Sequence, residues 1–386
     1  MELSKNIKKI KNSYYMLKLR ALNHRIYYRN GYDRMKKAME IYKKFKDKKP
    51  RMQILNEIRL CKKYWGCYPF HYFRYGLYKK NRELSEEALL DYIPEFFFYK
   101  IFLPYYDSDK YSILTEDKNI TEALFNRLNI SQPRTLFRLI ANKFYDEDYN
   151  IIKFDDILRK LNKMQIRKIF MKPVNGDGGY GILIFHIKDG EYYTKDRMYL
   201  NEELLRILGE QAEYIFQEGI EQDHSTAKIY PKSVNTFRIT TVNKEGEASI
   251  VCATLRLGKD EMEIDNGTQG GIVLGIDIET GRCMEYGITE TGEKFFRHPD
   301  SGFIFRDYEI TKWNEIKEFT INCANKLPQF TYLGWDIALT KDGLTAIETN
   351  LGFGIDHYQV PLGGLRRIFG IDDPMFYWRN LHSKSV

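Results

Sequence analysis

The feature that most constrains the fold is a glycine-rich segment, KPVNGDGGYG, which runs from Lys172 to Gly181. Its Gly176-x-Gly178-x-x-Gly181 spacing also occurs in dinucleotide-binding turns, but such a turn leads from a strand into a helix. Here the preceding RKIFMKP and the following GILIFHI both have strand composition, with no helical period. The segment is therefore predicted to be the tip of a β-hairpin.

A glycine-rich hairpin tip can bring backbone N–H groups close to phosphates, because glycine has no side chain to block the approach. A Walker loop is excluded because Ile182, rather than Lys followed by Ser or Thr, comes after Gly181. A protein kinase is excluded because Lys172 precedes the glycines and the chain has no HRD or DFG triplet. Phosphate binding is the favoured interpretation, and a purely structural glycine turn is the alternative.

Positive charge is concentrated near the N-terminus. Residues 1–50 contain 16 Lys and Arg against 4 Asp and Glu, although the whole chain of 386 residues has a net charge of only +7. The expected partner of this region is anionic: an acidic glycan, a membrane surface or nucleic acid. Nucleic acid ranks last because no recognition motif is present. The alternative is a solvated helical surface.

The overall composition is that of a soluble globular protein, with 43% hydrophobic and 29% charged residues. Met1 is followed by polar and basic residues instead of an apolar segment, so we expect a cytoplasmic location, or peripheral contact with the inner membrane face. The most apolar stretch, Tyr92 to Tyr106, is too short for a membrane span and predicts a buried helix or an interfacial segment. Five cysteines without metal-ligand spacing predict reduced thiols.

The chain changes character along its length. Residues 1 to about 110 have helical patterns, including one from Ile7, one from Asp33 and one from Arg51 to Gly66, and Ser85 is a predicted N-cap. A further helix is predicted with Ile120, Leu124 and Leu128 on one face, and another from about 311 to 327. RTLFRLI is a candidate strand. From residue 167 onward short strands dominate: RKIFMKP, GILIFHI, EYIFQEGI, NTFRITTV, ASIVCATLRL and GIVLGIDI.

A second functional pattern lies in LGWDIALTKDGLTAIETN, from Leu333 to Asn350, which predicts a hairpin. A three-residue loop at 341–343 would pair Thr340 with Leu344 and put Asp336 opposite Glu348. Trp335, Ile337, Leu339 and Ile347 would then face the core. Two opposed carboxylates lie roughly 5 Å apart and repel each other, so a divalent cation would relieve the pair. Oxygen ligands suit Mg²⁺ or Mn²⁺. Solvent-facing acids on an edge strand are the alternative.

Taken in order, these segments resemble the ATP-grasp superfamily, and more closely its sugar-transfer-associated branch. The resemblance extends from about Ser112 to Asp356 and includes Asp117-Lys118, FMKPVNGDGGYG, FQEGI, VNTFRITT, LRLG, DNGTQGG, GWDIAL and AIETN. It implies an α+β fold in which two α+β subdomains enclose ATP. The expected domains are a basic, aromatic-rich helical region at 1–110, a catalytic domain at 111–360 with a lid at roughly 135–220, and a C-terminal tail at 361–386.

The resemblance also implies roles for individual residues. Lys118 and Lys172 would contact the ATP phosphates, and the loop with Gly176, Gly178, Gly179 and Gly181 would close over them. Adenine would be read by Gln217, Glu218 and the backbone to Ile220, and the ribose by Glu221 or Asp223. Arg238, with Arg256, would hold the transferred phosphate, so both are candidate catalytic residues together with Lys172. Asp265, Asn266, Gly270 and Gly271 would lie near the acceptor or the phosphates. Asp336, Glu348 and Asn350 match the metal ligands.

The activity implied by this resemblance is an ATP-dependent carboxylate–amine ligase that works through an acyl phosphate. Its substrates would be a uronic-acid-type sugar and an amino acid or amine, used in surface or capsular polysaccharide assembly. One position departs from the family pattern: many such ligases have arginine where this chain has Gly334. A phosphotransferase acting on a hydroxyl and a non-catalytic nucleotide-binding scaffold are therefore the alternatives. His224 and His298 are possible acceptor-side groups, although a structural role is expected for each.

Overall fold

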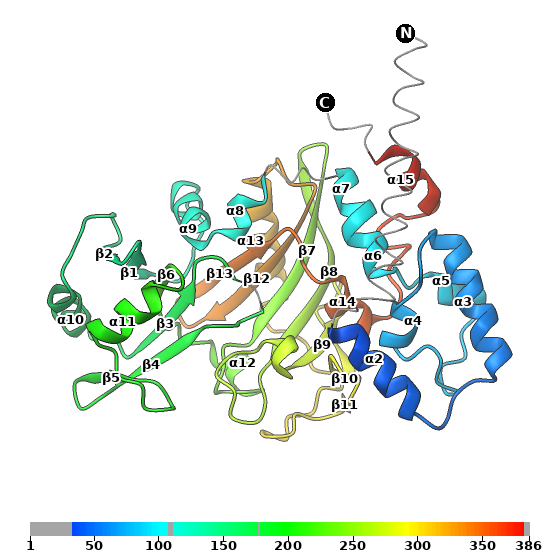
Figure 1. The fold of residues 1–386 in the computed structure, drawn as a ribbon, viewed down its shortest axis with the longest axis horizontal. Coiled ribbons are helices and arrows are strands. Elements are labelled where there is room, and N and C mark those ends of the chain that lie inside the picture. The colour runs from blue at the N-terminus through cyan, green and yellow to red at the C-terminus, as the bar shows by residue number, and fades with distance from the viewer. Residues whose placement is uncertain (1–32, 107–110, 177, 382–386) are drawn as a thin grey trace, which may run out of the picture.

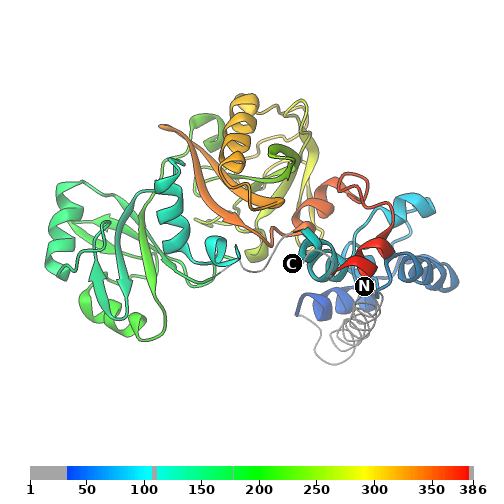
Figure 2. The same ribbon diagram turned by 90° about the horizontal axis from the view of Figure 1, so that it is seen from above.

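The structure, a computed structural model, describes residues 33–106, 111–176 and 178–381. These residues form three lobes arranged side by side (Figures 1 and 2). Two lobes are built on antiparallel sheets, and the third is a helical unit made from both ends of the described chain. The predicted α+β class is confirmed.

The helical unit collects short helices from the N-terminal third and from the C-terminal end. Among the described residues, no helix is long and apolar enough to cross a membrane. The predicted helix from Ile7 lies outside the described residues. The helices of the unit are α2 (Asp33–Lys44), α3 (Arg51–Trp65), α4 (His71–Arg74), α5 (Glu86–Leu90), α6 (Glu95–Phe97), a π-helical turn (Phe98–Phe102), α7 (Leu103–Tyr106), α14 (Ile355–Leu362) and α15 (Pro374–Asn380).

Local signals explain where several of these helices begin and end. Ser85 caps α5 by accepting a hydrogen bond from the Ala88 N–H, as predicted. Gly66 ends α3 in the left-handed region, at φ 70°, where its N–H donates to the Lys62 carbonyl. The apolar stretch after Tyr92 forms the predicted buried helix, because Phe97 and Phe102 are fully enclosed.

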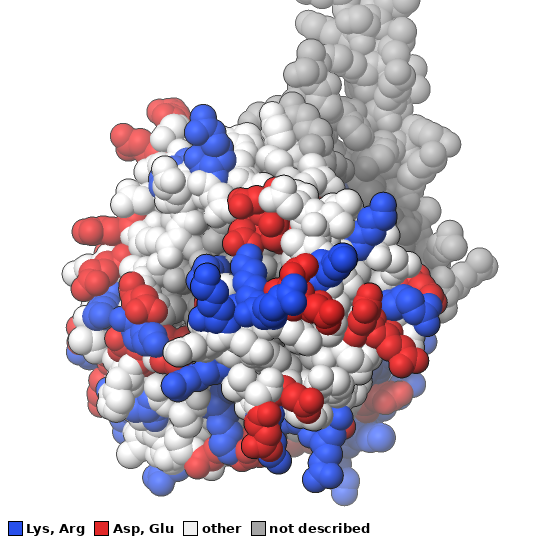
Figure 3. Space-filling model, turned by 90° about the vertical axis from the view of Figure 1, so that its left-hand side faces the viewer, with Lys and Arg blue, Asp and Glu red and all other residues white. Residues whose placement is uncertain are grey.

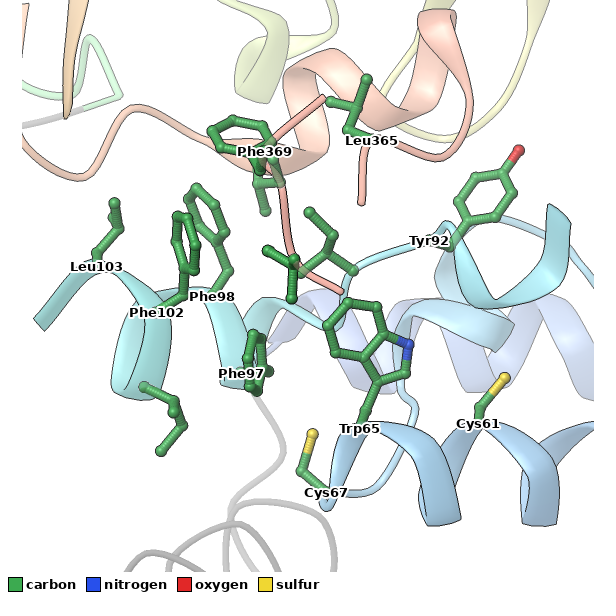
Figure 4. Close-up of a cluster of buried hydrophobic side chains, with 14 of the residues drawn as sticks. Cys61, Trp65, Cys67, Tyr92, Phe97, Phe98, Phe102, Leu103, Leu365 and Phe369 are labelled. Carbon is green, nitrogen blue, oxygen red and sulfur yellow. The ribbon is translucent and has the colours of Figure 1, made fainter. Parts of the chain in front are cut away.

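The core of this unit joins segments that are far apart in sequence. Trp65, Phe98 and Phe102 pack with Leu365 and Phe369, which come from the segment after α14 (Figure 4). Residues 365–381 therefore contribute to a shared core with the N-terminal helices. The buried thiols take no part in disulfides: all five cysteines are free.

The first sheet lobe contains six strands in the order β2-β1-β6-β3-β4-β5, and every pairing in it is antiparallel. Its amphipathic helices α10 (Phe154–Lys163) and α11 (Glu202–Gly209) were not predicted; Ile157, Leu161 and Leu205 are their buried contacts with the core. The strands are β1 (Thr135–Ile140), β2 (Lys143–Tyr145), β3 (Lys168–Pro173), β4 (Leu183–Lys188), β5 (Glu191–Tyr193) and β6 (Tyr214–Glu218).

The second sheet lobe contains seven strands in the order β11-β10-β9-β8-β7-β12-β13, again all antiparallel. One face packs on α13 (Trp313–Asn325), the helix predicted near 311–327, and on α9 (Lys118–Arg127). The strands are β7 (Thr236–Lys244), β8 (Glu247–Leu257), β9 (Ile272–Ile276), β10 (Cys283–Thr289), β11 (Lys294–Phe295), β12 (Tyr332–Thr340) and β13 (Gly343–Asn350); two short helices are α8 (Ile113–Glu116) and α12 (His224–Ala227).

The seven short segments that the sequence predicted to be strands are all strands in the structure. They are β1, β3, β4, β6, β7, β8 and β9. The predicted apolar face of α9 is wrong only at Ile120, because Leu124 and Leu128 pack against the core of the second sheet lobe. Ile120 is 38% exposed, whereas Phe125 is buried against the second sheet and Glu122 is buried in an ion pair with Arg138 of β1, at 2.6 Å. The helix therefore turns a partly polar face inward, because it bridges to a buried arginine.

The shared core generates a stability prediction. Trp378 of α15 is 1% exposed, and its Nε1–H donates to the Trp65 carbonyl at 2.9 Å. Trp378→Ala should lower the free energy of unfolding by about 3–5 kcal/mol. The control is Arg379→Ala on the same helix, where an exposed ion pair with Asp373 contributes at most about 1 kcal/mol. Urea denaturation compares the two; equal stabilities would show that α15 adds little to the core.

Candidate active site

A cavity of about 990 Å³ lies where the three lobes meet. The first sheet contributes the glycine-rich loop and the ends of β3 and β6, the second sheet contributes one polar face, and the helical unit closes the remaining side. Most of the residues predicted for the site line this cavity: Lys118, Lys172, Gly176, Gly178, Gly179, Gln217, Glu218, Ile220, Arg238, Arg256, Asp265, Asn266, Asp336, Glu348 and Asn350.

The polar face of the second sheet follows from strand register. On β12, Asp336 is paired with Arg238 of β7 on one side and with Glu348 of β13 on the other. Residues directly opposite on neighbouring strands share a face of the sheet. Asp336 is only 2% exposed, and its two oxygens lie 2.8 Å from Arg238 Nε and 3.1 Å from Arg256 Nη2. A buried carboxylate is thus held between two guanidinium groups.

Asp265 completes the charge balance around Arg256. The Arg256 Nη2 atom lies 3.5 Å from Asp265, and the Arg256 Nε–H donates to Thr236 Oγ1 at 3.0 Å. Asp265 also accepts a hydrogen bond from the Thr236 backbone N–H at 2.9 Å. Burial disfavours the charge of Arg256, but Asp265 and Asp336 outweigh it and raise the pKa of Arg256. The guanidinium therefore stays charged and fixed in place.

Two lysines approach this face from other elements. Lys118, at the start of α9, donates from Nζ to the Gly176 carbonyl at 2.7 Å and lies 3.6 Å from Glu348. Lys172 of β3 donates to Gln217 Oε1 on the adjacent strand β6, at 2.8 Å. Burial lowers the pKa of Lys172 to about 8, although the Glu348 carboxylate acts in the opposite direction.

The predicted glycine hairpin is confirmed, since β3 and β4 pair antiparallel on either side of the loop. Gly178, Gly179 and Gly181 all have positive φ, at 65°, 71° and 75°. Gln269 Nε2 donates to the Gly178 carbonyl at 3.2 Å, so the loop rests on the opposite lobe and covers part of the cavity. A Cβ atom at position 179 would come within 3.0 Å of Gln269 Nε2.

The β12–β13 hairpin differs from its prediction in two details. Thr340 pairs with Gly343 instead of Leu344, so the loop has two residues, although Gly343 does take a positive φ of 120°. A bulge in β13 then shifts the register, and Asp336 meets Glu348 as expected. The bulge also turns Ile347 into the cavity and leaves Ala346 in the core, so the predicted core position of Ile347 is wrong.

The candidate metal ligands provide an oxygen-rich but incomplete site. The described residues contain no group of three or more His, Cys, Asp or Glu that could hold a metal ion. Asp336, Glu348 and Asn350 nevertheless line one wall, and the buried Asn350 Nδ2 has no hydrogen-bond partner among the described residues. The predicted repulsion between Asp336 and Glu348 is already reduced without a cation, because two arginines neutralise Asp336. Two carboxylates and an amide still suit Mg²⁺, with phosphate oxygens as further ligands.

Some predicted residues lie outside the cavity. Glu221 is 60% exposed and pairs with Lys341 at 2.8 Å, while Asp223 caps α12. Glu263, which was not predicted, lines the cavity between Lys168 and His186. The others outside it are Gly181, Gly270, Gly271, the exposed His224, and His298, which is buried with Nε2 bonded to the Gly258 carbonyl.

The helical unit adds residues that the sequence argument missed. Arg74 is 7% exposed and lies 2.6 Å from Asp356, 2.5 Å from Glu95 and 2.8 Å from Glu290. Burial lowers the pKa of His357, which follows Asp356, to about 4. The only sequence feature that pointed to this part of the helical unit was the dense aromatic block CYPFHYFRYGLY, which contains Arg74. Four half-buried aromatic side chains line this side of the cavity: Tyr68, Phe70, Phe96 and Tyr99.

Lys172 provides a direct test of the electrostatics. In NMR titrations of ¹³C-methylated lysines, its amine should titrate near pH 8. Glu348→Gln should lower this pKa further, because the carboxylate attracts the ammonium group, whereas Asp342→Asn at the exposed turn should leave it unchanged. Since unfolded lysine titrates near pH 10.4, the unfolded state binds more protons between these values, and stability should rise with pH there. A normal lysine pKa would contradict the burial of this amine.

No curated protein is similar enough to be matched. Solved structures that resemble the chain include the ATP-grasp ligase PsnB with its minimal precursor (19% identity, TM-score 0.36, 68% of this chain and 62% of that one). Another is the purK N5-carboxyaminoimidazole ribonucleotide synthetase with ADP (8% identity, TM-score 0.36, 61% of this chain and 45% of that one). A third is the biotin carboxylase domain of Hydrogenobacter thermophilus 2-oxoglutarate carboxylase (13% identity, TM-score 0.38, 70% of this chain and 46% of that one). The chain spans less than two thirds of each of these proteins.

A family model described as sugar-transfer associated ATP-grasp matches residues 99–367, which is more than half of the chain. The matched range contains every residue of the polar sheet face, both lysines and the glycine loop. The family prediction is confirmed: the chain belongs to the sugar-transfer associated ATP-grasp family.

Proposed function

We propose that the protein is an ATP-dependent carboxylate–amine ligase that acts through an acyl phosphate. The observation that carries the proposal is the division of one cavity into two chemically different parts. One part presents Lys118, Lys172, Arg238 and Arg256, and the other presents aromatic rings and carboxylates from the helical unit. The first suits phosphates and a carboxylate, and the second suits an amine-bearing acceptor.

ATP would occupy the part between the two sheets. Lys118 and Lys172 place positive charge at the base of the glycine loop, whose backbone can approach phosphate oxygens closely. Gln217, Glu218 and Ile220, at the end of β6, line the same part and are the candidate adenine contacts. A divalent cation held by Asp336, Glu348 and Asn350 would supply charge neutralisation of the phosphates.

The two arginines would then act on the transferred phosphoryl group. In the first step a carboxylate oxygen attacks the γ-phosphorus and ADP leaves. In the second step the amine nitrogen attacks the acyl carbon, the C–N bond forms, inorganic phosphate leaves and the nitrogen loses a proton. Arg238 and Arg256 are fixed by Asp336 and Asp265, so they can stabilise developing negative charge with little reorganisation.

The acceptor would bind against the helical unit. Glu95 and Asp356 line this part of the cavity and suit an ammonium group, which also interacts favourably with faces of aromatic rings. Burial lowers the pKa of His357 to about 4, so the side chain is neutral at pH 7 and adds no positive charge that would repel an ammonium group. The proposed substrates are a uronic-acid-type sugar and an amino acid or amine; the sugar follows from the family description.

Gly334 bears on the phosphotransferase alternative. A Cβ atom at this position would lie 2.2 Å from Phe353 Cβ, so the packing has no room for an arginine. Arg238 and Arg256 on the neighbouring strands β7 and β8 instead supply two guanidinium groups to the same face. The loss of arginine at Gly334 therefore does not by itself favour phosphoryl transfer to a hydroxyl.

A product assay tests the proposal. The protein is incubated with ATP, Mg²⁺, uronic acids and a panel of amino acids, and products are identified by mass spectrometry. An amide, ADP and phosphate are expected. Glu348→Gln should reduce turnover by about a hundredfold or more, in line with the loss of a charged group that acts in the transition state, whereas exposed Glu210→Gln should be nearly neutral.

The other outcomes separate the alternatives. A product that retains phosphorus would replace the ligase with a phosphotransferase. Absence of any product or ADP, combined with normal nucleotide binding, would favour the scaffold. In vesicle sedimentation, binding to anionic lipid would support peripheral contact with a membrane.

The glycine loop generates a further prediction. Gly179→Ala should weaken ATP binding about tenfold, equivalent to roughly 1.4 kcal/mol, because the new methyl group would meet Gln269 and Asn266 and displace the loop. Gly190→Ala is the matched control: its φ is also positive, at 84°, but nothing lies within 4 Å of the added carbon. Calorimetric titration with ATP should separate the two variants, and equal affinities would exclude a close approach of this loop to the nucleotide.

A further inference from the structure

A second cavity of about 400 Å³ shares Arg74 as a lining residue with the candidate active site. It is enclosed by α2, α4 and the turn after it, the β10–β11 hairpin and α14. Figure 1 shows β10 and β11 beside α2 and α4. The cavity therefore lies at the junction of the helical unit and the second sheet.

The walls of this cavity are strongly cationic. Six lining residues are Lys or Arg, and two are acidic, Glu290 and Glu293. The cations are Lys37, Arg74, Lys79, Arg82, Lys259 and Lys294. On the outer face of the first sheet lobe, by contrast, basic and acidic side chains are interspersed (Figure 3).

Four of the six cations make no ion pair with any residue that the structure describes: Lys37, Lys79, Arg82 and Lys294. Arg82 donates to the Tyr92 hydroxyl at 2.7 Å, and Lys294 lies over the Tyr286 ring. The Arg82 Nε atom is buried without a hydrogen-bond partner. Burial, Arg82 and Lys294 all lower the pKa of Lys79, so the charges are close enough to repel one another. An anion would relieve this repulsion and satisfy the buried donor.

Arg74 connects the second cavity with the candidate active site. Its side chain lines both cavities. The guanidinium binds Asp356 and Glu95, which face the active site, and Glu290, which faces the second cavity. A chain of anionic sugars held in the second cavity would thus lie next to the acceptor part of the active site.

We propose that the second cavity is a binding site for carboxylate groups of an acidic glycan, held by Lys79, Arg82 and Lys294. Anion binding is inferred from the cavity itself, whereas the assignment of the anion to a uronic-acid glycan rests on the proposed function. Phosphate groups share the same chemistry, so the experiment must distinguish the two sources. The site would hold sugar units adjacent to the one that reacts.

The test uses the full chain and a fluorescently labelled hexamer of galacturonic acid, with fluorescence anisotropy at 0.05 and 0.15 M salt. The triple variant Lys79→Gln/Arg82→Gln/Lys294→Gln should weaken binding at least about tenfold, as expected when three screened charge contacts are lost. The matched control, Lys143→Gln/Lys163→Gln/Lys188→Gln, removes the same charge from exposed positions of the β1–β6 lobe and should change binding less than about twofold. Both variants should bind ATP like the parent protein, which confirms that they fold.

Several results would overturn the proposal. Equal loss of glycan binding in the two triple variants would show that binding depends on the overall charge of the protein and not on this cavity. Tighter binding of hexametaphosphate than of the galacturonate hexamer would assign the cavity to phosphate instead. Unchanged binding in the cavity variant would place the glycan elsewhere. Because the assay contains no ATP or amine, its outcome is independent of whether the ligase reaction is correct.

Discussion

The structure around the site depends on the burial of Asp336 between two arginines. A buried carboxylate is costly unless it is paired and hydrogen-bonded. Here pairing is achieved by strand order: β7 brings Arg238 directly opposite Asp336, and β8 adds Arg256. On the other neighbouring strand, β13, the register places Glu348 opposite Asp336. Loss of the carboxylate would leave two guanidinium groups close together, so this pairing defines both the sheet face and its charge.

The helical unit is joined to the second sheet lobe by a comparable charge network. Arg74 from α4 reaches Glu290 after β10 and Asp356 in α14, so three distant parts of the chain meet at one guanidinium group. Within the helical unit, Gln359 of α14 adds a neutral link, since it accepts from the Ile93 N–H and donates to the Ile93 carbonyl. These contacts fix the wall of the acceptor part relative to the sheet. The unit is therefore part of the proposed site.

Sequence patterns predicted the features that depend on local order. The glycine hairpin and the long strands follow from alternation and turn residues. The pairing of Asp336 with Glu348 was predicted correctly, but it results from a two-residue loop and a bulge instead of the predicted three-residue loop. The details that failed depend on tertiary context. The bulge that turns Ile347 into the cavity cannot be read from alternation, and α9 buries Glu122 because Arg138 arrives from another strand. Arg74 was missed because its partners Glu290 and Asp356 lie more than 200 residues away in sequence. His357 was missed because its low pKa depends on burial, which only the tertiary packing provides.

The position of Phe353 explains why this chain uses its neighbouring strands for positive charge. Phe353 packs over Gly334 and also joins the core of the helical unit, against Phe98 and Phe369. A larger residue at 334 would force the ring away and loosen the contact between the second sheet and the helical unit. Arginines on β7 and β8 avoid this conflict, because they project from the same face without displacing Phe353. Attachment of the helical unit and the departure from the family pattern at Gly334 thus have one steric cause.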